Sequence, residues 1–195
     1  MVAQRAAWRF AERGIRHVLD VGCGPGKFCV AAALARPNLH FFGIERGVGL
    51  TLTANAVAAS LRVSNVEFKA GNVLDAQWHD FDGFYFFNPF SEDSAPGSES
   101  ARTETDLLRV VELLGAANRG AIVITYHGLG GAIPSTYDLL SDEPVGSGRL
   151  RVWIKNRSRE AAWYHLDYAQ GVSRVPRRYF ERQSARKASA EATTE

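Results

Sequence analysis

The sequence predicts a single-domain α/β protein, a three-layer sandwich whose mainly parallel sheet lies between helices. Two observations support this class. Short apolar runs alternate with segments of helical periodicity over the first two thirds of the chain, which indicates parallel strands joined by right-handed crossovers. Near the end, two apolar runs flank the polar residues 157–160 (RSRE), which indicates a β-hairpin closing the sheet antiparallel. Seven strands are expected in all.

The first half of the chain supplies three strands and three helices. A helix is expected over residues 3–13, where Ala7, Phe10 and Ala11 follow helical spacing before Gly14. Further helices are expected at 27–36, ended by Pro37, and at 49–62. In the last of these, one apolar face would comprise Leu52, Ala56, Ala59 and Val63. Short apolar or alternating runs predict strands at 17–22, 40–45 and 65–72.

The second half is expected to complete the sheet. A strand is expected within 81–90 and another at 121–128. Residues 91–102 are expected to form a polar surface loop between the first of these strands and the next helix. That helix is expected over 103–119, with Thr103 as its cap. Residues 133–142 are expected to form a short helix. The hairpin strands are placed at 149–156 and 161–168, which puts Trp153 and Trp163 on the sheet.

The composition is that of a globular protein. The chain has 195 residues, 46% of them hydrophobic and 23% charged, enough for one compact core. Its apolar runs fall short of the roughly 20 residues that cross a bilayer, and its start lacks a signal-peptide pattern. The two cysteines, Cys23 and Cys29, form no metal-ligand or disulfide pattern. We therefore expect a cytoplasmic protein with no membrane partner and no metal; the oligomeric state stays open.

Charge is distributed unevenly along the chain. Residues 1–148 hold 12 Lys and Arg against 16 Asp and Glu, a net of −4, whereas residues 149–195 hold 11 against 5, a net of +6. Residues 171–195 therefore form a basic tail, expected to be partly disordered. Such a tail is either a solvated end or an arm for an anionic partner.

The strongest motif is the stretch VLDVGCGPGKF, residues 18–28, between the first strand and the next helix. Gly22, Gly24 and Gly26 let the backbone turn sharply and approach a ligand. A P-loop is excluded, because Phe28 stands where Ser or Thr should follow Lys27. A dinucleotide fingerprint, GxGxxG, needs one more residue, so it is disfavoured but stays open. The third possibility is S-adenosylmethionine.

VLDVGCGPGKF resembles the first motif of class I S-adenosylmethionine-dependent methyltransferases, an acidic residue followed by GxGxG. FFGIE, VEFKAGNVLD and FDGFYFFNPF resemble the later motifs of that family, in the same order. The resemblance covers residues 15–170 and implies a Rossmann-like methyltransferase domain over residues 1–170. It also implies S-adenosylmethionine as cofactor and S-adenosylhomocysteine as product.

The resemblance assigns roles to the matched residues. Asp20 would accept hydrogen bonds from the loop amides and face the methionine amino group. Gly22, Cys23, Gly24 and Gly26 would border the methionine and ribose. Glu45, 25 residues after Asp20, would accept both ribose hydroxyls. Asn72 stands where the family has an aspartate for the adenine amine, and Val73 would offer its backbone N–H to the adenine ring.

The acceptor side is marked by FFNPF, residues 86–90. It resembles the NPP(Y/F/W) motif of amino-methyltransferases but lacks one proline. The resemblance implies that Asn88, also at the edge of the cofactor, accepts hydrogen bonds from the acceptor amine, that Pro89 stiffens the loop, and that Phe90 stacks on the acceptor. Tyr85 and Phe86 are expected in the core. His127 is a further possible proton acceptor.

These observations leave four functions open. The first is methyl transfer to a nitrogen of a protein side chain or a small molecule. The second is an amino-base methyltransferase of nucleic acid, and the third a non-catalytic protein that binds S-adenosylmethionine and supports a partner. The fourth is a nicotinamide-dependent enzyme.

Overall fold

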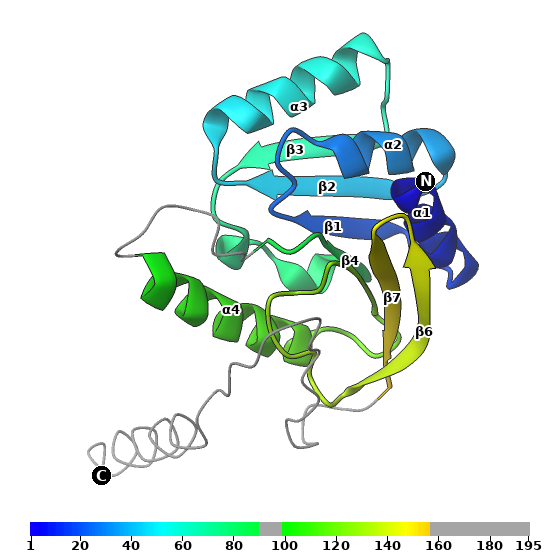
Figure 1. Ribbon diagram of the computed structural model, residues 1–195. Coiled ribbons are helices and arrows are strands. Elements are labelled where there is room, and N and C mark those ends of the chain that lie inside the picture. Colours follow the sequence, from blue (N-terminus) through cyan, green and yellow to red (C-terminus); the bar gives the residue numbers. More distant parts are fainter. Residues whose placement is uncertain (90–98, 157–195) are drawn as a thin grey trace.

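The computed structural model describes residues 1–89 and 99–156, which form a seven-stranded sheet between two layers of helices (Figure 1). The strand order is β3-β2-β1-β4-β5-β7-β6. The strands are β1 (His17–Val21), β2 (His40–Glu45), β3 (Val66–Ala70), β4 (Gly83–Phe86), β5 (Ile122–Tyr126), β6 (Tyr137–Val145) and β7 (Gly148–Lys155). The first five are mutually parallel, and β7 runs antiparallel to both β5 and β6. The predicted fold class is confirmed.

Helices cover both faces of this sheet. α1 (Val2–Glu12), α2 (Lys27–Ala35) and α3 (Val48–Ser60) lie on one side, and α4 (Glu99–Ala116) lies on the other (Figure 1). Two short 3₁₀ turns, η1 (Val73–Asp75) and η2 (Trp78–Asp80), join β3 to β4. Each face has its own apolar core. One contains Phe10, Cys29, Ala33, Phe41 and Tyr85, and the other contains Leu19, Trp78, Phe84, Val110 and Leu114.

The hairpin differs from the predicted one. Residues 137–145 form β6, so the short helix expected over 133–142 is wrong. Leu139 and Leu140 are both exposed, so they do not form a buried helix face. The segment instead completes the hydrogen-bond ladder along the free edge of β7. Pro144 is tolerated because β6 is the edge strand. The expected strand 149–156 corresponds to β7, and the expected strand 161–168, with Trp163, lies outside the described residues.

The helix expected over 103–119 begins earlier, at Glu99, so Thr103 lies within α4 and is not its cap. Residues 99–102, expected in a surface loop, are the first residues of this helix, because Glu, Ala and Arg favour helix extension. The rest of that loop lies outside the described residues. The other end of α4 is capped from β7, where the buried Lys155 donates from Nζ to the carbonyls of Leu114 (3.4 Å) and Gly115 (2.5 Å).

The buried face of α3 is not the expected one. Thr51, Ala54 and Ala58 are buried, whereas Leu52, Ala56 and Ala59 are exposed, Leu52 by 65%. This helix has no charged residue, so its apolar pattern is compatible with more than one face. The face with the small Ala54 packs inward because only a small side chain fits beside the crowded glycine loop described below.

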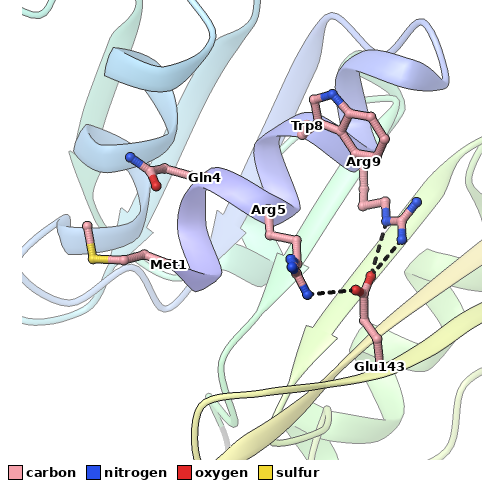
Figure 2. A pocket seen from close by; sticks show the side chains of 6 residues that line it. All are labelled: Met1, Gln4, Arg5, Trp8, Arg9 and Glu143. Atoms are coloured by element: carbon pink, nitrogen blue, oxygen red, sulfur yellow. Dashed lines mark hydrogen bonds and ion pairs between the residues drawn. The ribbon is translucent and has the colours of Figure 1, made fainter.

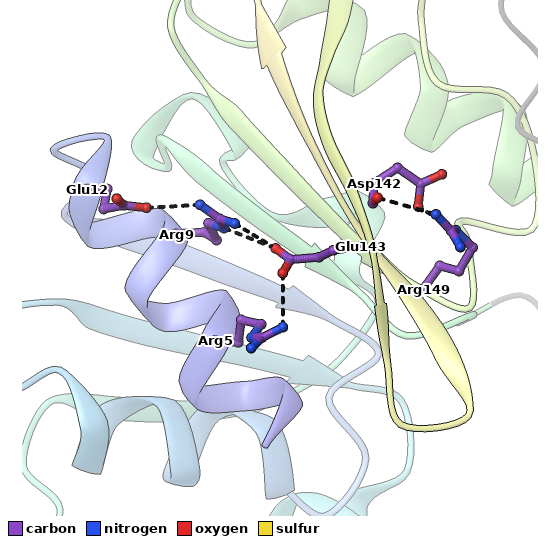
Figure 3. Close-up of polar contacts among 6 residues, drawn as sticks. All are labelled: Arg5, Arg9, Glu12, Asp142, Glu143 and Arg149. Carbon is purple, nitrogen blue, oxygen red and sulfur yellow. Dashed lines mark hydrogen bonds and ion pairs between the residues drawn. The ribbon is translucent and has the colours of Figure 1, made fainter.

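α1 is attached to the hairpin by charged groups. Glu143 of β6 accepts hydrogen bonds from Arg5 at 3.0 Å and from Arg9 at 2.8 and 3.1 Å (Figure 2). On the same strand, Asp142 accepts from Arg149 of β7 at 2.7 Å, which ties the two hairpin strands together (Figure 3). Helix and hairpin therefore form one side wall of the domain.

A search of the described helices for a segment long and apolar enough to span a bilayer found none.

Candidate active site

The carboxyl ends of the parallel strands meet at one edge of the sheet. Val21, the last residue of β1, pairs with Ile44 on one side and with Phe86, the last residue of β4, on the other. The strand order reverses at β1, since its neighbours β2 and β4 continue the chain in opposite directions across the sheet. In open α/β sheets, ligands bind outside the carboxyl ends at such a reversal. The glycine loop (residues 22–26) and the β4 loop (residues 87–89) both begin there.

Each of the three glycines of the glycine loop is a glycine for a different structural reason. All have positive φ: +72° at Gly22, +54° at Gly24 and +76° at Gly26. A Cβ on Gly26 would lie 2.6 Å from the Phe68 ring and 2.8 Å from the Ala54 Cβ, so Gly26 is required by packing. A Cβ on Gly24 would have nothing within 4 Å. Gly24 is thus the point where the loop backbone is open to a ligand.

Glu45 holds the outer part of the glycine loop. Its Oε2 accepts the Gly24 N–H at 3.0 Å, and its Oε1 accepts the Gly47 N–H at 2.9 Å. Each carboxylate oxygen can accept more than one hydrogen bond, so both retain capacity for a ligand hydroxyl. The structure therefore places this acid directly against the open glycine, as a ribose-binding role would require. The contact with a ribose itself stays a prediction.

Asp20 is buried behind the glycine loop. The loop amides were expected to donate hydrogen bonds to it, but they do not. Gly22 and Cys23 donate to the Ile44 carbonyl, and the Gly26 N–H donates to the Cys23 carbonyl. The Asp20 carboxylate accepts instead from the Cys29 thiol of α2, with 3.3 Å between Sγ and Oδ2. Burial raises the pKa of Asp20 to about 7; the thiol hydrogen bond opposes this shift, and the charge of Glu45 adds to it.

Cys23 has a steric role. Its side chain is 8% exposed, and a Cβ on Gly43 of β2 would lie 2.6 Å from its Sγ. Burial raises the pKa of the Cys23 thiol to about 12, so it stays protonated and unreactive at neutral pH. It packs the inner side of the glycine loop onto β2, and its expected contact with a cofactor stays a prediction.

Asn72 follows β3 at the same edge and caps η1. Its Oδ1 accepts the Leu74 N–H at 3.1 Å and a hydrogen bond from Arg46 at 3.2 Å. Arg46 also pairs with Asp106 of α4 at 2.6 Å, so this corner links β2, η1 and α4. The adenine amine is a hydrogen-bond donor, so it would have to donate to Oδ1 in place of Arg46. Val73 is 8% exposed, and its contact with the adenine ring is likewise untested.

The β4 loop lies against the glycine loop. A Cβ on Gly22 would lie 3.2 Å from the Cβ of Pro89, a tighter contact than side chains normally make, and the positive φ of Gly22 also favours glycine where the two loops meet. Asn88 has a left-handed backbone, φ +43°, and its N–H donates to the Gly128 carbonyl after β5 at 3.2 Å. Asn88 and Pro89 thus sit where the cofactor and acceptor sides would meet. Phe90 lies outside the described residues.

One residue at this edge, Phe87, was not assigned a binding role from the sequence. Phe87 is 56% exposed directly after four buried residues of β4, and its ring lies 5.4 Å from both the Tyr126 and His127 rings. Tyr85 and Phe86 are in the core as expected. The run of aromatic residues gave no alternation that would distinguish Phe87 from its buried neighbours. Its position just past the strand end was the one available signal.

A second concave region lies away from this edge, between α1 and β6. It is an open hollow of about 390 Å³ lined by Met1, Gln4, Arg5, Trp8, Arg9 and Glu143 (Figure 2). The Arg9 guanidinium lies 5.2 Å from the Trp8 ring centre, and Arg5 and Arg9 both bind Glu143, so the charged side chains of the hollow are paired with each other. Among residues 1–89 and 99–156, no cluster of three or more metal-ligating side chains occurs.

Comparison with known proteins agrees with this geometry. Residues 15–128 match the family described as the methyltransferase domain. Two tRNA (guanine-N(7)-)-methyltransferases match over short stretches. That of Microcystis aeruginosa is 40% identical over 55 residues, 28% of this chain and 26% of the relative. That of Synechococcus elongatus is 35% identical over 54 residues, 28% and 25% of the two chains. The match thus spans about a quarter of these relatives.

Solved structures share the fold across most of the chain. A putative methyltransferase, yhhF from Escherichia coli, superposes with a TM-score of 0.59 at 17% identity, over 80% of this chain and 87% of that one. An RNA methyltransferase from Salinibacter ruber, solved with S-adenosylhomocysteine, gives 0.55 at 16% identity, over 86% and 96%.

A parallel sheet with its glycine loop at the point of strand-order reversal, closed by an antiparallel hairpin, defines a class I, Rossmann-like methyltransferase fold. The family match covers more than half of the chain and includes β1 to β5. The chain belongs to the methyltransferase domain family.

Proposed function

We propose that this protein transfers a methyl group from S-adenosylmethionine to a nitrogen atom of its acceptor. The observation that carries the proposal is the pair of hydrogen bonds that the amides of Gly24 and Gly47 donate to the Glu45 carboxylate. They bring the only open glycine of the three in the loop next to an acid with spare acceptor capacity. A nucleoside with a free ribose and an attached amino acid fits such a site.

The residues present suit this cofactor. The open backbone at Gly24 would border the ribose and methionine parts, Glu45 would bind the ribose hydroxyls, and Asp20 would face the amino group from behind the loop. When bound, S-adenosylmethionine supplies a methyl group already activated by a positively charged sulfur. The protein then has to align the acceptor lone pair with the carbon–sulfur bond and exclude water.

The acceptor side comprises the segments after β4 and β5. Asn88 would hold the acceptor nitrogen through its side-chain amide, and the hydrogen bond from its N–H to Gly128 fixes its backbone. The attacking nitrogen must lose a proton before or after transfer. His127, beside Phe87, is the titratable side chain at this position, and it would take up that proton.

The test separates binding from transfer. Calorimetry on the full-length chain should show S-adenosylhomocysteine binding in the micromolar range and no comparable binding of NAD. Formation of S-adenosylhomocysteine should then depend on an added nitrogen acceptor. Absence of binding would refute the proposal, tighter binding of NAD would favour a nicotinamide enzyme, and binding without turnover on any acceptor would favour a non-catalytic partner protein.

A nucleic-acid acceptor is a second candidate, supported by the tRNA (guanine-N(7)-)-methyltransferases that match part of the chain. The net charge of +6 over residues 149–195 is compatible with it. Turnover on unfractionated tRNA that falls steeply with added salt would favour this acceptor over a small molecule.

A further inference from the structure

Phe87 is unusual among the aromatic residues of β4 and its loop. Phe84 and Phe86 are fully buried and Tyr85 nearly so, but Phe87 is 56% exposed at the carboxyl edge. A single exposed apolar side chain is ordinary on a protein surface. This one is different because two other rings support it and because it lies in the loop that touches the glycine loop.

The supporting rings come from the end of β5. His127 lies edge-on to Phe87, at 75° and 5.4 Å, and Tyr126 is tilted against it at the same distance. His127 and Tyr126 also contact each other at 4.3 Å. One side of the Phe87 ring is therefore covered by other side chains, while more than half of the residue's surface faces solvent.

The hairpin turn holds these supporting rings in place. The Tyr126 hydroxyl donates to the Val145 carbonyl at 2.7 Å. A Cβ on Gly148 would lie 2.7 Å from the His127 Cε1, so a glycine is needed for the imidazole to pack against the turn. His127 itself has a left-handed backbone, φ +61°. The arrangement is built from three separate elements, and it is not one mobile side chain.

The backbone connects this aromatic wall to the cofactor side. Asn88, next to Phe87, is bound through its N–H to Gly128, next to His127, and Pro89 packs on Gly22. The exposed part of Phe87 therefore lies on the same edge as the open Gly24. A group stacked on Phe87 would be a neighbour of whatever occupies the glycine loop.

We propose that Phe87, supported by His127, is the binding wall for a planar nitrogen heteroaromatic ring, the part of the acceptor that receives the methyl group. This inference rests on the proposed function and specifies its acceptor class. A flat ring stacks on an aromatic face whatever its substituents. An aliphatic ammonium is disfavoured, because the Asp20 carboxylate accepts from the Cys29 thiol and the Glu45 carboxylate from the Gly24 and Gly47 amides.

The first experiment observes the wall directly. 4-Fluorophenylalanine is incorporated at position 87 of the full chain, and its ¹⁹F resonance is followed after saturation with S-adenosylhomocysteine. Guanosine 5′-monophosphate and N-acetylhistidine amide should each shift the resonance in a saturable way, whereas N-acetyllysine amide should not. No shift with either ring compound, or an equal shift with the lysine compound, would overturn the inference.

The second experiment uses matched variants. Phe87→Leu keeps an apolar side chain but removes the ring, and Trp8→Leu removes an exposed aromatic ring on α1 as a control. Phe87→Leu should weaken binding of the ring compounds at least tenfold and leave S-adenosylhomocysteine affinity within twofold, while Trp8→Leu should change neither. Equal ring binding by Phe87→Leu would refute the wall and leave the cofactor assignment standing.

The source of the ring is distinguished in the same system. Unfractionated tRNA, free guanosine and a histidine-containing peptide are compared for S-adenosylhomocysteine formation. Turnover on any of these should fall at least tenfold in Phe87→Leu. Turnover on a lysine peptide that Phe87→Leu does not change would contradict the inference while leaving methyl transfer itself intact.

Discussion

The Cys29 thiol donates a hydrogen bond to the Asp20 carboxylate across 3.3 Å, in a part of the core that is closed to water. The acid lies at the end of β1 and the thiol in the first turns of α2, so the bond spans the glycine loop from beneath. A buried carboxyl whose main partner is a weak donor is poorly stabilised in its charged form. The pH dependence of stability should reveal this.

Raising the pH from about 4 to about 7 should lower the free energy of unfolding, because of Asp20. Its folded-state pKa, about 7, lies above the ordinary value of 3.8, so the folded state keeps a proton that the unfolded state releases. This contribution is present below pH 4, is lost as pH rises to 7, and is a few kcal/mol at most. Asp20→Asn removes it, so the variant should gain stability relative to wild type between pH 5 and pH 8 in urea unfolding. The exposed Asp75→Asn is the control. If the difference in free energy of unfolding between Asp20→Asn and wild type is the same at pH 4 and at pH 7, the assignment is contradicted.

Glu45→Ala should weaken S-adenosylhomocysteine binding by roughly 1–3 kcal/mol, as for a lost charged hydrogen-bond partner. The variant loses both the expected ribose contacts and the anchor of the Gly24 and Gly47 amides. Calorimetry measures the affinity, and Glu67→Ala, an exposed acid on β3, is the control. Wild-type affinity in Glu45→Ala would count against the ribose assignment.

Alanine at two positions of the glycine loop should have different effects: at Gly26 mainly on stability, at Gly24 mainly on cofactor binding. Gly26→Ala should destabilise the fold by about 2–4 kcal/mol, because it combines a left-handed backbone with a clash against Phe68 and Ala54. Gly24→Ala should cost only about 1–2 kcal/mol of backbone strain. It should nevertheless reduce S-adenosylhomocysteine affinity at least tenfold, since its methyl enters the open space. Urea unfolding and calorimetry check both, and equal stability of the two variants would be inconsistent with the packing described.

Asn88→Gly should preserve cofactor affinity and slow methyl transfer. Glycine tolerates the left-handed backbone at this position and keeps the N–H that binds Gly128, so only the side-chain amide is removed. S-adenosylhomocysteine affinity should stay within twofold while kcat falls at least tenfold on a competent acceptor. If affinity and kcat both remain at wild-type values, Asn88 serves only the loop backbone.

Glu143→Ala should loosen α1. This carboxylate is the shared partner of Arg5 and Arg9 and is 21% exposed, so its loss should cost about 1 kcal/mol. Glu112→Ala removes a fully surface pair with Arg109 and should change stability by less than about 0.5 kcal/mol. Hydrogen exchange of the α1 amides should accelerate in the first variant only. Equal exchange in both would show that apolar packing alone holds the helix.

Much of the fold could be predicted because its signals are local. β1, β2 and α2 occur within one residue of their expected bounds, since each combines an apolar run with a glycine or proline boundary. β6 could not be predicted, because Tyr137 to Val145 gains its partners only from β7, and its local pattern does not alternate. The buried face of α3 was likewise decided by a distant contact, that of Ala54 with the glycine loop.

The candidate site shows the same division. The positions of Gly24 and Glu45 followed from motif spacing, and the structure joins them by a hydrogen bond. The partner of Asp20 did not follow, because a thiol nine positions along the chain reaches it only once α2 is formed. Phe87 and His127 meet because each directly follows one of two paired strands, β4 and β5, a contact that the local sequence around either residue does not indicate.

Gly43 bears on how this loop would meet a ligand. A Cβ there would lie 2.6 Å from both the Cys23 Sγ and a Phe68 ring carbon, so glycine loop, β2 and β3 interlock without free space. With its amides already committed to Ile44 and Glu45, the loop has its shape before any molecule arrives. Association therefore need not freeze this backbone, and little conformational entropy would be lost there. The heat capacity change of binding would then report released water and not local folding.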